Sequence, residues 1–146
     1  MRIALVVLFL LFSSPAYSQG FQPFAGSWNG SGIAHLGGGN EKFKCKSLNS
    51  GNADAIRITL RCASGKSSYE LRSSVALVGS KVSGTWEFVT YGAAGAVLGN
   101  LAGDRLSGTM QGSGYSGRFT VTRSGSQLTM HVISNDGTSF NATLNK

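Results

Sequence analysis

The chain has 146 residues, including 21 glycines, and carries 13 lysine and arginine residues against six aspartate and glutamate residues, a net charge of +7. This length supports one domain with its own core and excludes two domains of ordinary size. Glycine is about twice as frequent as in average proteins. Because β-branched and aromatic residues recur in alternation, the composition nevertheless excludes a disordered low-complexity chain.

Residues 1–18 differ in character from the rest of the chain. Arg2 is their only charge, Ile3 to Phe12 are continuously apolar, and residues 13–18 are mostly small. The apolar run has about half the length that a membrane-spanning helix needs. This pattern predicts a signal peptide cleaved near Ser18, a single domain at 19–146 of net charge +6, and a periplasmic or secreted location without an integral membrane span.

A short phrase recurs along the chain and predicts hairpin turns. It stands at Gly79 to Trp86, at Gly103 to Met110, and in degraded form at Gly125 to Met130. In each copy a turn glycine is followed by a polar residue, an aliphatic residue and then alternation, which is typical of a tight turn that enters a half-buried strand. The sequence therefore predicts an antiparallel meander.

Alternation of apolar and polar residues marks the expected strands. In chain order they lie at residues 24–35, 41–48 and 55–63, then in a strand after the Gly65-Lys66 turn that contains Tyr69 to Leu77, and then at 81–90, 105–111, 115–123, 127–134 and 138–145. The uncharged segment 91–103 is expected to be a flat strand of small residues, with a mobile loop or short helix as alternatives. Eight to ten strands with one apolar face each, and no substantial helix, predict an all-β fold closed into an up-and-down barrel.

Lysine and cysteine residues alternate on the second expected strand. Lys42, Lys44 and Lys46 share one face and indicate either a charged guard on an exposed strand edge or attraction to an anionic surface, while the basic residues as a whole are spread along the chain. No nucleic-acid partner is expected outside the cytoplasm. Cys45 and Cys62 lie about equally far from the centre of the intervening turn, which predicts a disulfide between neighbouring strands.

The residue types that carry catalysis are sparse and scattered. His35 and His131 are the only histidines, and no two acidic residues lie close in sequence. These features predict no catalytic site, no metal site and no cofactor. His131 is expected to point outward between the inward-facing Met130 and Val132, although a shift of one residue in register would turn it toward the interior.

Aromatic side chains concentrate on the face expected to be inward. Such side chains fill the core of small barrels, but a barrel of eight or more strands also has room for one small ligand. The expected lining of a pocket for an apolar ligand is Tyr69, Leu71, Trp86, Phe88 and Met110, with segment 91–103 as a lid.

The phrase Phe24-Ala-Gly-Ser-Trp28 resembles the Gly-x-Trp signature of the calycin superfamily, which includes lipocalins, fatty-acid-binding proteins and avidins. The resemblance implies that Trp28 is a structural plug at one end of the barrel, that Gly26 permits its close approach, and that Arg123 stands in for the late arginine that stacks on the tryptophan. The chain also resembles small exported bacterial proteins of unknown function with this lipocalin-like pattern.

Three functions are consistent with these resemblances. The first is a carrier or sensor of a small apolar molecule. The second is a protein interaction module, because periplasmic inhibitors of secreted metalloproteases are also small disulfide-bearing barrels, and the resemblance places Gln19 to Phe24 in a protease cleft. The third is a haem-binding barrel, because the phrase from Gly26 to Gly32 is similar to one found in nitrobindin-like barrels. This function needs His131 to face inward.

Overall fold

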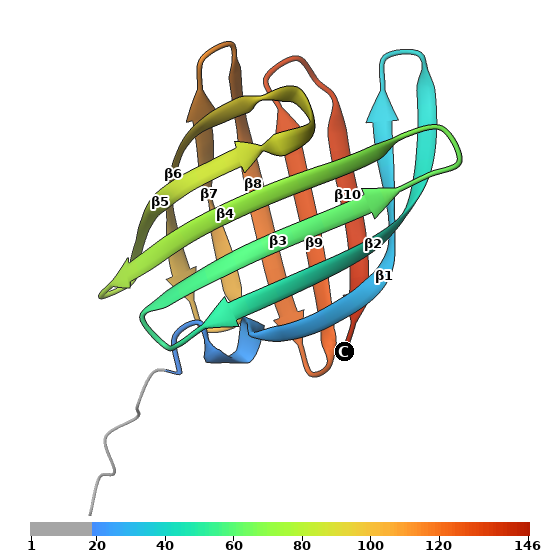
Figure 1. Cartoon of the computed structure of the whole chain (residues 1–146). Helices are drawn as coiled ribbons and strands as arrows, with labels where there is room; N and C mark the ends of the chain where they lie inside the picture. The colour runs from blue at the N-terminus through green and yellow to red at the C-terminus, as the bar shows by residue number, and fades with distance from the viewer. Residues whose placement is uncertain (1–18) are drawn as a thin grey trace, which may run out of the picture.

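The structure is a computed structural model that describes residues 19–146, so the predicted signal peptide lies outside the described residues. Ten antiparallel strands form a closed barrel in which each strand pairs with its neighbours in sequence and β1 pairs with β10 (Figure 1). The strands are β1 (Gly26–Leu36), β2 (Gly39–Gly51), β3 (Ala55–Ala63), β4 (Ser68–Val78), β5 (Lys81–Phe88), β6 (Ala93–Ala102), β7 (Arg105–Gly112), β8 (Tyr115–Ser124), β9 (Gln127–Ser134) and β10 (Ser139–Asn145). The predicted all-β barrel of eight to ten strands is confirmed.

Two short 3-10 turns interrupt the strands, η1 (Gln22–Phe24) before β1 and η2 (Val89–Tyr91) between β5 and β6. Phe24, expected to begin the first strand, therefore belongs to η1. No helix within residues 19–146 is long and apolar enough to cross a bilayer.

Most of the uncharged segment 91–103 forms strand β6, which confirms the preferred prediction of a flat strand. The prediction that the whole segment acts as a lid is wrong. β6 pairs with β5 on one side and with β7 on the other along nearly its full length. A Cβ at inward-facing Gly95 would collide with the carbonyl of Gln111, and a Cβ at Gly108 with that of Leu98. Glycine here permits close approach of neighbouring strands and does not indicate a loop.

The lysines of β2 do not guard an edge, because β2 pairs with both β1 and β3 in the closed barrel. The outer face of β2, β3 and β4 gathers basic residues that are distant in sequence. Six basic side chains and one acidic side chain point outward there: Lys42, Lys44, Lys46, Arg57, Arg61, Arg72 and Glu70. Arg61 Nε donates to Glu70 Oε1 at 2.6 Å. The barrel therefore has one strongly basic side.

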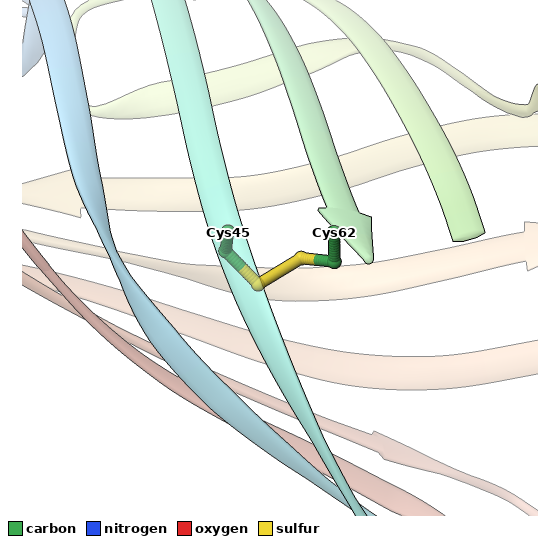
Figure 2. Close-up of a disulfide and its surroundings, with 2 residues drawn as sticks. All are labelled: Cys45 and Cys62. Atoms are coloured by element: carbon green, nitrogen blue, oxygen red, sulfur yellow. A yellow bond between two sulfur atoms is a disulfide. The ribbon is translucent and has the colours of Figure 1, made fainter. Parts of the chain in front are cut away.

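The predicted disulfide between Cys45 and Cys62 is confirmed (Figure 2). The two residues are direct partners in the ladder between β2 and β3, with their Cα atoms 4.1 Å apart. Both side chains are buried. The bridge lies toward the end of β3 and indicates an oxidising, exported environment.

Candidate functional site: a barrel cavity with one sealed end

One end of the barrel, here called the floor, is sealed by the segment that precedes β1. Phe21 and Trp28 are completely buried and Phe24 is 3% exposed. In Figure 1 η1 lies at the lower end of the barrel, close to the C-terminal end of the chain. Phe21 N–H donates to the carbonyl of Ala53 in the β2–β3 turn at 3.0 Å, which fixes the segment against the sheet. The plug role that the calycin resemblance implied for Trp28 agrees with this burial.

Hydrogen bonds satisfy the polar groups that the floor buries. The carbonyl of Phe24 accepts from Trp28 Nε1 at 3.0 Å and from Asn49 Nδ2 at 2.9 Å. Ser47 Oγ donates to Asn49 Oδ1 at 2.6 Å. An unpaired buried donor costs about 1–3 kcal/mol, so this network removes a penalty that the closed end would otherwise carry.

The cation over the plug is Lys146, and the role given to Arg123 is wrong. Lys146 Nζ lies 5.2 Å from the centre of the Trp28 ring and donates to the carbonyl of Ala25 at 2.9 Å. Arg123 instead forms an ion pair with Asp104, with 2.6 Å between Nη2 and Oδ1. A Cβ at Gly26 would lie 2.7 Å from Lys146 Cε, so this glycine makes room for the lysine.

Above the floor the barrel encloses a cavity of about 570 Å³. Its lining includes all five predicted residues, Tyr69, Leu71, Trp86, Phe88 and Met110. Their contact with a ligand stays a prediction. The lining also includes Leu36 and Tyr91, which are 45% and 67% exposed. The cavity therefore reaches the surface at the end of the barrel opposite the floor, here called the mouth.

Several lining residues were not predicted from the sequence. Tyr115, Val97 and Ser134 all contribute to the wall. Tyr115 shares the parity of Phe119 and Val121 on β8, so strict alternation contained the signal for it. Val97 could have been found in the same way once segment 91–103 was assigned as a strand.

Aromatic rings pack against one another on one side of the mouth. The Tyr69 ring lies edge-on to Phe43 with 5.2 Å between centroids, and Tyr91 stacks on Phe88 at 5.1 Å. A hydrogen bond with Tyr69 is the main cause that raises the pKa of Tyr91 above its usual value. The phenol of Tyr91 is therefore neutral at physiological pH.

Tyr115 lies on the other side of the mouth, with its ring 5.3 Å from that of Trp86 in an edge-on arrangement. Burial raises the pKa of Tyr115 above its usual value; the nearby Ser134 side chain opposes this shift, and the charge of Asp136 adds to it. The indole Nε1 of Trp86 is buried and has no hydrogen-bond partner among the described residues. It is a polar group that the fold leaves unsatisfied.

Both histidines lie outside the cavity lining. His131 is exposed on the outer face of β9 and its Nδ1 bonds to Asn141 Oδ1, while His35 is exposed and bonds to Asn40. Strand alternation turns His131 outward, as expected, so the inward histidine that the haem-binding alternative requires is not present. Within residues 19–146, no three side chains of histidine, cysteine, aspartate or glutamate gather around one point.

The segment Gln19 to Phe24 is built into the floor. Phe21 and Phe24 pack in the core, and their backbone groups bond to Ala53, Trp28 and Asn49. Insertion into a protease cleft would require these rings and hydrogen bonds to leave the barrel. The placement contradicts the mechanism that the inhibitor alternative assigned to this segment.

These features define the chain as a closed ten-stranded antiparallel β-barrel with a sealed floor and an internal apolar cavity. It matches no protein-family model and no curated protein. Its fold is similar to the crystal structure of Rv2717c from M. tuberculosis, with TM-score 0.71 and 10% identity over 86% of this chain and 94% of that chain.

Two redesigned β-barrels are also similar. The structure of mFAP1 bound to DFHBI gives TM-score 0.54 and 11% identity over 88% of this chain and all of that chain. The structure of b11L5F_LGL gives TM-score 0.50 and 10% identity over 88% of this chain and 95% of that chain. At these identities the similarity shows the fold alone.

Proposed function

We propose that this protein is a calycin-like, non-catalytic exported protein that binds one small apolar molecule in the barrel cavity. The observation that carries the proposal is the cavity of about 570 Å³, which lies in the size range of pockets for small ligands. A barrel that only needed a packed core would fill this volume with side chains.

The shape and lining of the cavity support this function. Deep wall residues such as Leu60, Val75 and Leu106 are apolar and almost completely buried. Water in such a space finds few hydrogen-bond partners, so its replacement by an apolar ligand is favourable. The solved structure of mFAP1, a redesigned barrel of similar fold, has a small molecule bound. This similarity supports the view that a barrel of this fold can hold a small molecule, and it does not identify the ligand of this protein.

The test is binding of the neutral apolar fluorophore N-phenyl-1-naphthylamine to the purified protein. Its emission is expected to rise on entry into the cavity and to saturate at one equivalent. Leu71→Trp places a larger side chain in the cavity wall and should weaken binding about tenfold or more. Native mass spectrometry of the same preparation tests for a ligand that co-purifies with the protein.

The matched control is Leu98→Trp. Leu98 points outward from β6 and is 59% exposed, so the same substitution there adds a tryptophan side chain outside the barrel. The Leu98→Trp variant should bind the fluorophore with the same affinity as the unmodified protein. Lack of any saturable binding, or equal weakening by both variants with the barrel still folded by circular dichroism, would contradict a cavity ligand.

A further inference from the structure

The cavity is lined without charge. Every described residue in its wall is apolar, aromatic, glycine, or a neutral hydroxyl-bearing residue such as Ser134 or Thr138. The nearest acidic groups belong to the mouth region. Glu41 accepts a hydrogen bond from Ser64, and Asp136 accepts from the backbone and hydroxyl of Thr138. A ligand inside the barrel therefore meets no basic side chain.

This lining disfavours ionic ligands of either sign. A carboxylate or phosphate in the cavity would lose its water without gaining a cation, and such a transfer is costly. A cation could in principle use aromatic faces. However, the wall offers no carboxylate to pair with a cation, and the stacked rings of Phe88 and Tyr91 each turn one face toward the other.

Two side chains that can donate hydrogen bonds meet where Trp86 of β5 lies against Tyr115 of β8. The Tyr115 ring lies 5.3 Å from that of Trp86, and its side chain is one of those that line the cavity. A phenol hydroxyl can donate one hydrogen bond, so Tyr115 offers a donor beside the indole of Trp86. The neighbouring Trp86 is 3% exposed and its Nε1 proton has no acceptor within residues 19–146. Indole can only donate, so this group requires an acceptor from outside the fold.

We propose that the ligand is an uncharged, largely apolar molecule with one hydrogen-bond acceptor oxygen, which binds beside Trp86 and Tyr115. This inference rests on the proposed function and narrows its ligand class to neutral ketones, esters, quinones or ethers of suitable size. The apolar part lies against the deep wall, and the oxygen accepts from Trp86 Nε1, the buried donor without a partner in the described residues, and from the neighbouring Tyr115 hydroxyl. The pairing would remove a penalty of about 1–3 kcal/mol that the unpaired indole carries in the free protein.

The test is displacement of bound N-phenyl-1-naphthylamine by three probes with similar ten-carbon chains. The probes are 2-decanone, decanoate and decyltrimethylammonium, all at pH 7.5 and below their micellar concentrations. The ketone should displace the fluorophore at concentrations about tenfold lower, or more, than either ion. Equal or tighter binding of decanoate or of the ammonium probe overturns the inference while the proposed function stands. Failure of the fluorophore itself to bind overturns the proposed function.

Two variants test the position of the acceptor. Trp86→Phe and Tyr115→Phe each remove one donor and keep an aromatic ring, and each should weaken 2-decanone about fivefold to tenfold with little change for the fluorophore. Tyr91→Phe is the matched control, because it removes a phenol from the other side of the mouth. Equal losses for ketone and fluorophore, or an equal loss in Tyr91→Phe, would overturn the assignment.

A spectroscopic measurement separates hydrogen bonding from a merely structural role. The carbonyl stretch of 2-decanone should shift to lower wavenumber on binding to the unmodified protein. The shift should shrink in Tyr115→Phe and in Trp86→Phe and persist in Tyr91→Phe. A bound ketone without any shift means that its oxygen meets no donor and overturns the proposal.

Discussion

The two ends of the barrel differ in how they treat a buried tryptophan. At the floor, Trp28 is completely buried and its indole proton is paired with the carbonyl of Phe24. At the mouth, Trp86 is almost as deeply buried, yet its indole proton has no partner among the described residues. The same side chain is thus fully satisfied at one end and left unsatisfied at the other. The difference fits a floor that contributes stability and, under the proposed function, a mouth that receives the ligand.

The difference arises from what each end packs into the barrel. The floor receives an extra segment, with Phe21 and Phe24 inserted below the strands. Above the floor no such segment enters the barrel, and the inward side chains of the strands, such as Leu71 and Val97, line a cavity of about 570 Å³. Local sequence thereby divides one continuous sheet into a solid part and a hollow part.

Removal of the plug should have the largest effect on stability. Trp28→Ala deletes a completely buried aromatic side chain and removes one of the two side-chain donors to the Phe24 carbonyl. The expected loss is about 3–5 kcal/mol in the free energy of unfolding, measured by urea titration. Tyr91→Ala at the mouth, where the side chain is 67% exposed, should cost much less. Equal losses at the two ends would contradict the division of roles.

Loss of the disulfide should have the next largest effect. Cys45 and Cys62 are 17 residues apart in sequence, and for a loop of this size the chain-entropy model gives about 3 kcal/mol. The double variant Cys45→Ala/Cys62→Ala should unfold at correspondingly lower urea concentration. Its unfolding should not respond to reductant, whereas the unmodified protein should shift toward the variant when reduced. If reduction leaves the unmodified protein unchanged, the bridge does not stabilise the fold.

Much of the architecture could be predicted because its signals are local. Alternation within a strand decides which side chains face inward, so Trp86 and Phe88 were placed on the inner face from sequence. The pairing of Cys45 with Cys62 followed from their equal distances to one turn. Both inferences depend on residues within about 20 positions, where chain geometry leaves few choices.

The errors concern contacts that only barrel closure creates. Lys146 reaches Trp28 because β10 pairs with β1, and no local pattern relates residues this far apart. Closure also removed the edge that Lys44 was expected to guard. The unpaired Nε1 of Trp86 could not be predicted from the sequence either, because the absence of an acceptor depends on all the neighbours of the indole in three dimensions.

Disruption of the buried polar network of the floor should lower the free energy of unfolding by less than loss of the plug or of the disulfide. Asn49→Ala removes the donor to the Phe24 carbonyl and the acceptor of the Ser47 hydroxyl, and leaves Ser47 buried without this partner. The expected cost is about 1–3 kcal/mol by urea unfolding. Asn100→Ala on the outer face of β6 is the matched control and should change stability by about 0.5 kcal/mol or less. A similar cost for both asparagines would mean that the network adds nothing beyond ordinary packing.

The smallest expected effect belongs to the cation over the plug. Lys146→Met removes the ammonium group and keeps most of the stem that packs beside Gly26. An exposed cation–π contact contributes about 0.5–1 kcal/mol, so the variant should lose about this much by urea unfolding, and Trp28 emission should change. Lys146→Arg should retain most of the stability, because guanidinium can also lie over an indole. If Lys146→Met matches the unmodified protein while Lys146→Ala does not, the aliphatic stem alone seals the floor and the ammonium charge is dispensable there.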